Sequence, residues 1–219
     1  MTPRFDPALL PPAPTLEFEQ ALWQAGFELV AGLDEAGRGA LAGPVCAAAV
    51  ILPRSDGEFP VSLYGVRDSK QLSPVRREDL AAKIWQAALA VGVGWCSAAE
   101  VDELGMGKAG RLVLERAVRK LAPAPQQLLI DYFKLPQVSL PQQGLVKGDQ
   151  RSLTIACASV IAKTQRDAWM READRQFPGY GFGQNKGYGS AAHRAALRQC
   201  GPCPLHRRSF RLLPEVLPD

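Results

Sequence analysis

Short apolar runs alternate with helical repeats along this chain. Four runs have the length and composition of β-strands: residues 27–33, 45–52, 91–96 and 128–131. Apolar residues three and four positions apart predict helices over residues 15–26, 74–88, 107–121, 152–177 and 190–199. Because strands alternate with helices, we expect an α/β layered fold, and the short loop between the first two strands indicates a mixed sheet.

The predicted helices carry start and stop signals. Ser73 followed by Pro74 is typical of an N-cap and a first-turn proline. The long helix over 152–177 ends before Pro178, and its small residues near the start would let another element approach closely. A glycine-rich loop at 179–189 separates it from the last helix.

Composition is that of an ordinary globular protein. The chain has 219 residues, of which 47% are hydrophobic and 22% charged, enough for one large domain. The longest apolar stretch, 40–52, is shorter than the roughly 20 residues of a membrane span. The acidic N-terminal region does not fit a signal peptide. Cys46 and Cys157 lie among apolar residues, as buried free thiols do. We therefore expect a cytoplasmic protein that makes no membrane contact.

The formal net charge of +4 is unevenly distributed. Residues 179–219 contain six lysines and arginines against Glu215 and Asp219, so this segment carries the whole excess. A neutral body with a basic end favours binding of a polyanion at that end, although a solvated basic tail is the alternative. The sequence thus divides into a flexible proline-rich lead-in (1–14), a main domain (15–178) and a basic C-terminal segment (179–219).

Acidic residues stand at the ends of predicted strands. Asp34 and Glu35 close the first strand, Asp131 closes the strand at 128–131, and Asp149 precedes the long helix. Carboxylates that meet without a nearby base repel one another and bind hard divalent cations, whereas solvated turn residues are the alternative. Neighbouring strand residues point to opposite faces, so Asp34 and Glu35 would need irregular backbone to face one metal. The glycines that follow could provide it.

Two further motifs carry possible chemistry. Gly37-Arg38-Gly39 lets backbone N–H groups approach a phosphate or a sugar, although a tight hairpin turn is the alternative. Cys200-Gly201-Pro202-Cys203 has the spacing of thioredoxin-like thiols, but it follows a helix instead of starting one. A zinc site would need more ligands than the two thiols and His206. With two histidines and no nucleophile elbow or phosphate loop, the sequence favours a metal site over a nucleophile triad.

Seven sequence blocks occur in an order that is specific to one family. The first is DEAGRGALAGPV at 34–45. The others are DSKQLS at 68–73, LID at 129–131, KGD at 147–149, SVIAK at 159–163 with Arg166 and Asp167, NKGYG at 185–189 and HRRSF at 206–210. Together they span roughly residues 29–211, and they resemble ribonuclease HII, the bacterial type 2 ribonuclease H.

The resemblance implies a fold and a metal site. The fold would be ribonuclease H-like, an α/β fold with a mixed β-sheet flanked by helices and a small C-terminal helical segment. Residues 15–178 would be the catalytic domain. Asp34, Glu35 and Asp131 would bind metal, and Asp149 would be the fourth catalytic carboxylate. The cofactor would be a divalent metal, Mn²⁺ or Mg²⁺, with two ions present during catalysis.

The resemblance also implies how substrate is held. Residues 37–39 (Gly37, Arg38 and Gly39) would read the ribose 2′-hydroxyl, and Tyr188 would lie under the sugar on the 3′ side of the ribonucleotide. Lys70, Lys163 and Lys186 would lie along the nucleic-acid backbone. Tyr132 departs from the family, which more often has glycine at this position, and it could crowd the site.

The activity implied is that of a monomeric endoribonuclease that takes part in ribonucleotide excision repair. It would cleave the RNA strand of RNA–DNA hybrids and single ribonucleotides in duplex DNA. The cut 5′ of the ribonucleotide would leave 3′-hydroxyl and 5′-phosphate ends. Two alternatives remain: a ribonuclease HIII-like nuclease, and a thiol redox protein that uses Cys200 and Cys203.

Overall fold

Five strands form one sheet in the order β3-β2-β1-β4-β5. The computed structural model describes residues 5–6, 10–55 and 60–213, so half of the predicted lead-in (1–4 and 7–9) lies outside the described residues. The strands are β1 (Val30–Ala36), β2 (Val45–Ile51), β3 (Ala90–Cys96), β4 (Gln127–Asp131) and β5 (Gln142–Leu145). β1, β2 and β3 are antiparallel neighbours, whereas β4 is parallel to β1 and to β5. The predicted mixed sheet of an α/β fold is confirmed.

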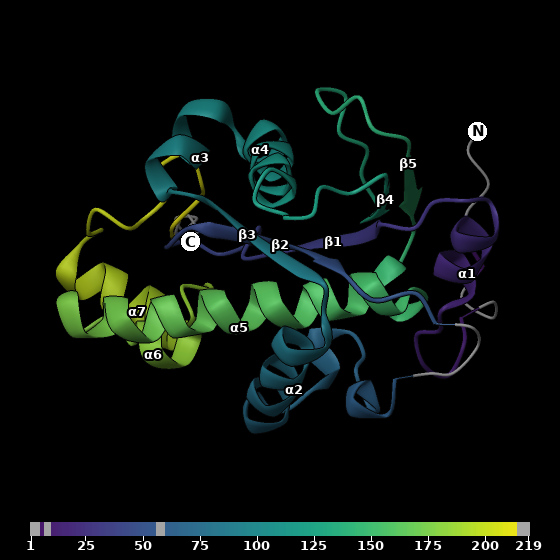
Figure 1. Ribbon diagram of the computed structural model, residues 1–219. Helices are drawn as coiled ribbons and strands as arrows, with labels where there is room; N and C mark the ends of the chain where they lie inside the picture. Colours follow the sequence, from purple (N-terminus) through teal and green to yellow (C-terminus); the bar gives the residue numbers. More distant parts are fainter. Residues whose placement is uncertain (1–4, 7–9, 56–59, 214–219) are drawn as a thin grey trace.

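Helices cover both faces of this sheet (Figure 1). The long helix α5 (Leu153–Gln176) and α2 (Pro74–Ala87) lie on one face, and α3 (Ala98–Leu104) and α4 (Met106–Val118) lie on the other. Each face has its own apolar core, because alternate residues of the strands point to opposite sides. On β1, Val30 and Ala36 belong to the α5 core, whereas Ala31 and Leu33 belong to the α4 core.

The long helix packs unusually close to the central strand. A Cβ atom at Gly32 of β1 would lie 2.2 Å from the backbone carbonyl carbon of Thr154 in α5. Ala156 and Ala158, the next small residues of α5, are fully buried. The prediction of a close approach from small residues at the start of this helix is therefore confirmed, and the first turns of α5 are fixed against β1.

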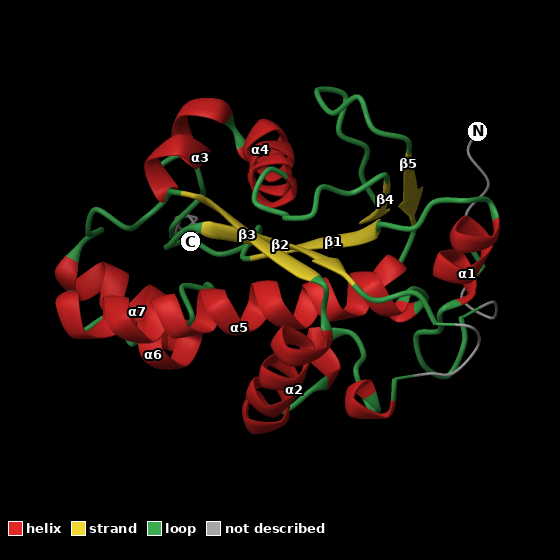
Figure 2. Ribbon diagram, viewed as in Figure 1, coloured by secondary structure: helices red, strands yellow, loops and turns green. Residues whose placement is uncertain are grey.

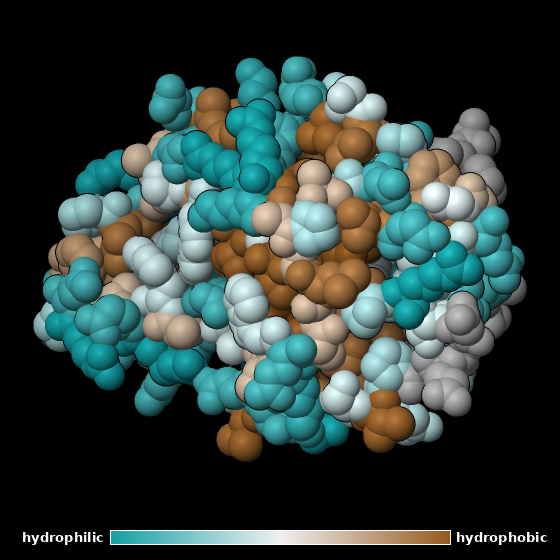
Figure 3. All heavy atoms as spheres, viewed as in Figure 1, coloured by the Kyte–Doolittle hydropathy of each residue, from teal (hydrophilic) through white to brown (hydrophobic). Residues whose placement is uncertain are grey.

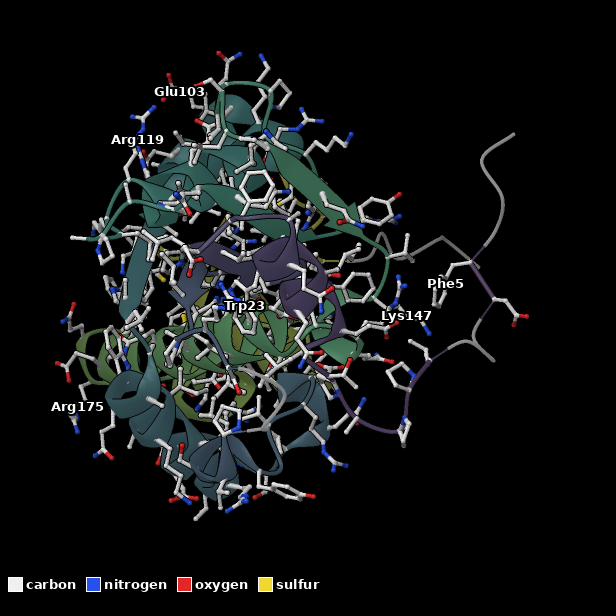
Figure 4. All side chains as sticks on the ribbon, turned by 45° about the vertical axis from the view of Figure 1, so that its right-hand side comes forward. Phe5, Trp23, Glu103, Arg119, Lys147 and Arg175 are labelled. Carbon is white, nitrogen blue, oxygen red and sulfur yellow. The ribbon has the colours of Figure 1, made fainter. Side chains whose placement is uncertain are left out.

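The short helix α1 (Glu17–Gln24) closes the end of the sheet near the start of α5. Trp23 of α1 is buried in the core of the α5 face. Figure 4 shows Trp23 toward the middle of the molecule, whereas Glu103, Arg119 and Arg175 extend from its surface.

The segment after α5 folds back onto that helix. It contains α6 (Phe182–Asn185) and α7 (Ala191–Cys200), seen beside the far end of α5 in Figure 2. Its apolar side chains form a third core cluster with the 41–42 loop and α5: Leu41, Ala42, Met170, Ala173, Tyr180, Phe182, Leu197 and Cys203. Residues 179–213 are therefore packed structure, and the rest of the predicted basic segment, 214–219, lies outside the described residues.

Three details differ from the sequence predictions. β1 begins three residues later than predicted and continues through Asp34 and Glu35, which therefore do not close it. Helix α3 was not predicted, although Ser97 and Glu100 form a capping box at its start. Strand β5 was missed because its sequence, QQGL, is mostly polar and lies at the edge of the sheet.

The surface is mixed in character. Figure 3 shows hydrophobic residues gathered in the middle of one face, with hydrophilic residues around them. Within the described part of the chain, no helix combines the length and hydropathy that a membrane crossing needs.

Candidate active site

The sheet has a notch where β1 extends beyond β4. The parallel pairing joins Val30–Leu33 of β1 to Gln127–Ile130 of β4, and β4 ends at Asp131. Asp34 and Glu35 therefore have β2 on one side and an open edge on the other. The carboxylates of β1 and β4 meet at this notch because one strand ends where its neighbour continues.

The expectation of irregular backbone at Asp34 and Glu35 was wrong. Both lie in regular strand, paired with Ala48 and Ala47 of β2. By strand alternation, Asp34 projects from the α5 face and Glu35 from the α4 face. Both side chains still line one cleft, because the missing continuation of β4 leaves the notch open to either face.

This cleft has a volume of about 420 Å³ and brings most of the predicted site together. Its lining comes from five parts of the chain: Asp34, Glu35, Ala36, Gly37, Arg38, Gly39, Ser69, Lys70, Asp131, Ser159, Lys163 and Tyr188. Asp149 lies just behind the lining and is buried. Lys186 is not part of the cleft wall.

Three of the carboxylates, Asp34, Glu35 and Asp131, accept a hydrogen bond from a nearby donor. Asp34 Oδ1 accepts from the N–H of Glu35 at 2.7 Å, and Asp131 Oδ1 accepts from the N–H of Gly148 at 2.8 Å. Glu35 Oε1 accepts from Arg38 at 3.1 Å, whereas its other oxygen, Oε2, is buried without a partner. Among the described residues, no three acidic, histidine or cysteine side chains are yet close enough to enclose an ion.

The electrostatics of the cleft favour a bound cation. Burial raises the pKa of the Asp34 carboxyl well above its usual range, and the nearby charges of Glu35, Asp131 and Asp149 raise it further. Burial together with Asp131 raises the pKa of Asp149 to about 7. The pKa values of Glu35 and Asp131 are also raised by burial, although hydrogen bonds from Arg38 and Gly148 offset part of the effect. Buried carboxylates that repel one another are stabilised in their ionised form by a nearby positive charge, such as a bound cation.

The chemistry of these donors fits a hard divalent metal. Carboxylate oxygens are the ligands that Mg²⁺ and Mn²⁺ prefer. The unpartnered Oε2 of Glu35 is a buried acceptor that lacks a donor in the protein itself. By their chemistry, Asp34, Glu35, Asp131 and Asp149 are the residues that could hold such a metal.

A fifth carboxylate, Asp68, stands beside this cluster. It shares a hydrogen bond with Asp149, whose pKa it helps to raise, and it accepts from the N–H of Lys70 at 2.9 Å. The sequence shows Asp68 only as part of a matched block, because no local signal indicates that residues 68 and 149 meet.

The predicted lysines have different surroundings. Burial alone would lower the pKa of Lys70, but the surrounding carboxylates, Asp68 first, raise it instead. Lys163 pairs with Asp167 at 2.7 Å, and Asp167 also faces Arg77 at 3.9 Å. Lys186 donates to the carbonyl of Gly183, and burial lowers its pKa. Lys70 and Lys163 face the cleft, whereas Lys186 is turned into its own loop.

Two buried arginines hold the loop that begins at Gly37. Arg166 of α5 donates to the carbonyls of Pro44, Ala42 and Lys186 at 2.8–3.1 Å. Its guanidinium packs so closely beneath Gly37 that a Cβ there would lie 2.0 Å from Nε. These contacts explain why the sequence needs glycine at position 37, whose φ is +94°.

The second arginine comes from the C-terminal segment. Arg207 is fully buried and donates twice to Gly43 O and once to Arg38 O, all within 3.0 Å. The sequence gives no role to either arginine beyond membership of a matched block, because each donates to carbonyls of the 38–44 segment, more than 100 positions away.

Tyr188 lines the cleft, whereas Tyr132 lies outside it. The ring of Tyr188 lies in the cleft, about one-third exposed, with Lys163 Nζ 5.4 Å and Arg166 Cζ 5.3 Å from its centroid. Tyr132 points outward with 68% exposure and packs edge-on against Phe133. It adopts a left-handed φ of 64°. The expectation that Tyr132 crowds the site is not borne out by its position, and the backbone there is one that glycine adopts without strain.

The two cysteines of the 200–203 turn have different surroundings. All five are free thiols, and Cys203 is buried while Cys200 is exposed. Burial raises the pKa of the Cys203 thiol, which is the opposite of what a reactive thiolate needs. Cys46 and Cys157 are buried as predicted, and burial raises the pKa of Cys46 to about 12.

Comparison with known proteins agrees with this geometry. The family model "Ribonuclease HII" matches residues 31–213. The ribonuclease HII of Geobacillus thermodenitrificans is 50% identical over 202 residues, which cover 92% of this chain and 76% of the relative.

Two solved structures resemble the fold. The ribonuclease H2 of Pyrococcus horikoshii has a TM-score of 0.71 at 25% identity, covering 84% of this chain and 94% of its own. A Bst-RNase HIII, solved in complex with Mn²⁺, has a TM-score of 0.65 at 22% identity and covers 88% of this chain and 70% of its own, which is a likeness of fold alone. The chain therefore belongs to the ribonuclease HII family, a group of ribonuclease H nucleases.

Proposed function

We propose that this protein is a metal-dependent endoribonuclease that cuts 5′ of a ribonucleotide paired with DNA. Its substrates are RNA–DNA hybrids and single ribonucleotides embedded in duplex DNA, and its products carry 3′-hydroxyl and 5′-phosphate ends. The observation that carries the proposal is the notch between β1 and β4, where Asp34, Glu35 and Asp131 share one cleft with the Gly37–Gly39 loop.

The acidic residues would hold the cofactor. Asp34, Glu35, Asp131 and Asp149 would bind Mn²⁺ or Mg²⁺, and Arg38 would release Glu35 when the metal enters. Bound divalent cations supply an activated water and neutralise charge on the leaving oxygen, and two ions can do both. The hydrogen bond between Asp149 and Asp68 needs a proton on one of the two carboxyls, so Asp149 would give up that bond when it ionises to bind metal.

The loop at 37–39 would identify the ribose. A 2′-hydroxyl is the one sugar group that distinguishes RNA from DNA, so a reader at the backbone level is sufficient. Arg207 donates to the Arg38 carbonyl within this loop, and the guanidinium of Arg166 packs beneath Gly37. A loop fixed in this way loses little entropy on binding. Lys70 and Lys163 would face the phosphates beside it.

Tyr188 would sense the junction between RNA and DNA. Its ring lies in the same cleft as the Gly37–Gly39 loop, so a ribose held by the loop places the next sugar toward the ring. A deoxyribose would stack there, whereas a 2′-hydroxyl would clash. This residue favours a ribonuclease HII activity over the ribonuclease HIII-like alternative, for which no junction-sensing tyrosine is expected.

Removing a cluster charge tests the metal site. Asp34→Asn and Asp131→Asn should each abolish cleavage, because asparagine keeps the shape but removes the charge that holds the cation. Both variants should still bind duplex, and their thermal stability without metal should equal or exceed that of the parent, because like-charge repulsion falls. Near-normal turnover of either variant at saturating metal would refute the assignment.

Ring substitutions test the junction sensor. Tyr188→Ala should slow cleavage at a single ribonucleotide more than it weakens binding, because base–aromatic stacking is worth roughly 1–3 kcal/mol in nucleic-acid complexes. Tyr188→Phe keeps the ring and should lose much less. If Tyr188→Ala slows single-ribonucleotide and all-RNA substrates equally, the ring does not sense the junction.

A further inference from the structure

Two buried histidines connect the C-terminal segment to the backbone of Tyr188. His193 Nδ1 lies 2.9 Å from the carbonyl oxygen of Tyr188. His193 Nε2 lies 3.1 Å from Nε2 of His206, and the N–H of Cys203 points at His206 Nδ1 from 3.0 Å. These contacts form one continuous chain of hydrogen bonds, and its two imidazoles are the only histidines in the sequence.

The partners at the two ends of this chain indicate which ring nitrogen of each histidine carries the proton. The carbonyl of Tyr188 can only accept, so His193 carries its proton on Nδ1 and leaves Nε2 bare. His206 must then supply the proton between the two Nε2 atoms, which leaves its own Nδ1 bare. That nitrogen accepts the N–H of Cys203, a backbone donor that would otherwise be buried without a partner.

A competing arrangement is less well supported. His206 Nδ1 also lies 3.3 Å from the carbonyl oxygen of Cys203, which would accept if Nδ1 carried the proton. That carbonyl already accepts from the N–H of His206 at 3.0 Å. With Nδ1 protonated, neutral His206 could not donate to His193, and two bare Nε2 atoms would face each other at 3.1 Å.

Both imidazoles are buried among aromatic rings, and burial disfavours the charged form of a histidine. His193 is fully buried and His206 is 2% exposed, and the ring of Phe182 lies against both. Tyr180 covers His206 at a ring separation of 5.0 Å. The Tyr188 carbonyl also accepts from the N–H of Ser190 at 2.8 Å, so the backbone of Tyr188 is held by two donors.

We propose that His193 and His206 are positioning residues that aim the ring of Tyr188 into the cleft. Together they link the backbone N–H of Cys203 to the backbone carbonyl of Tyr188 through consecutive hydrogen bonds, and this link fixes the Tyr188 backbone relative to the Cys203 turn. The inference deepens the proposed function, because it rests on Tyr188 as the junction sensor. It also gives a role to the Cys200–Cys203 turn, which supplies a backbone N–H while its thiols stay outside the chain.

The first test reads the protons directly. Long-range ¹⁵N–¹H spectra of the untagged protein at pH 7 give four imidazole nitrogen signals, which a His193→Asn sample assigns. The proposal expects His193 to be protonated on Nδ1 and His206 on Nε2, each as a single tautomer. Identical tautomers, or signals averaged between tautomers, would overturn it, whether or not the protein cleaves any substrate.

The second test uses two variants that differ in which contact they keep. Asparagine at 193 places its amide near the position of Nδ1 and can still donate to the Tyr188 carbonyl, whereas glutamine reaches only the position of Nε2. His193→Gln should therefore lower the preference for a single ribonucleotide over continuous RNA by about two- to tenfold, the range of one hydrogen bond. His193→Asn keeps the donor to the Tyr188 carbonyl but loses the contact with His206, so it should lower the preference less than His193→Gln does.

The readouts separate positioning from folding. In His193→Gln, kcat on the junction substrate should fall more than binding, while the rise in melting temperature on adding Mn²⁺ stays as in the parent. Equal preference in the two variants, or an unchanged preference in His193→Gln, would overturn the proposal. If Tyr188→Ala itself leaves the preference unchanged, the proposed function of Tyr188 fails instead, and the tautomer measurement still decides whether the chain of hydrogen bonds exists.

Discussion

Asp149 shows how neighbouring residues decide the state of a single carboxyl. The sequence predicts that Asp34, Glu35, Asp131 and Asp149 act together, because matched blocks carry them. It does not predict that Asp68 shares a hydrogen bond with Asp149, or that burial raises the pKa of Asp149 to about 7. Both effects depend on side chains that only the fold brings together.

The raised pKa of Asp149 has a consequence for stability. In the metal-free folded protein, the Asp149 carboxyl keeps its proton up to about pH 7, whereas in the unfolded chain it loses the proton near pH 4. The stability that Asp149 contributes is therefore greatest at low pH and is lost as pH rises from about 4 to 7. The free energy of unfolding of the parent, relative to Asp149→Asn, should fall over this window in EDTA. A constant difference between the two proteins would contradict the assignment.

At the scale of elements, the structure depends on a contact that periodicity cannot show. Glu19 of α1 is fully buried, and its Oε1 accepts from the Ser152 hydroxyl, the Thr154 hydroxyl and the Thr154 N–H, all within 2.9 Å. It thus caps α5 from another helix, just after Asp149. The sequence predicts both helices from their apolar spacing, but it offers Glu19 only as an acidic residue near the N-terminus.

Substitutions at Glu19 test this cap. Burial raises the pKa of Glu19, so its charge is costly when ionised. Glu19→Gln keeps the accepting oxygen and should match or exceed the parent in free energy of unfolding at pH 8. Glu19→Ala leaves buried donors unpartnered and should cost about 2–5 kcal/mol. Urea unfolding of the three proteins measures the difference. Equal stability of the alanine and glutamine variants would show that the cap does not hold α5.

At the scale of the molecule, the arginines of the basic C-terminal segment divide into buried and exposed ones. Arg207 is buried against loop carbonyls, and Arg194 donates to the carbonyls of Gly189 and Leu212. Arg198 and Arg208 are exposed and remain available to a polyanion. The net charge of the segment can be counted from the sequence. Which of its arginines are buried and which are exposed cannot, because a charge count does not distinguish the two.

The exposed arginines can be tested without disturbing the core. Arg198→Gln with Arg208→Gln, placed in the inactive Asp34→Asn protein, should weaken duplex binding and flatten its salt dependence. Each lost phosphate contact changes the slope of log K against log salt by about 0.9. Fluorescence anisotropy between low and moderate salt measures the slope. An unchanged slope would mean that these residues are only solvated. Deleting residues 179–219 is a poorer test, because it would remove the packed cluster around Phe182.

The most direct test of the account is cleavage of duplex DNA that carries one ribonucleotide, with and without a divalent metal. With Mn²⁺ or Mg²⁺, we expect a single cut 5′ of the ribonucleotide that leaves a 3′-hydroxyl and a 5′-phosphate. With EDTA, or with Asp34→Asn at saturating metal, we expect no product. Cleavage that persists in EDTA, or a cut at another bond, would contradict the assignment of the β1–β4 notch as the catalytic centre.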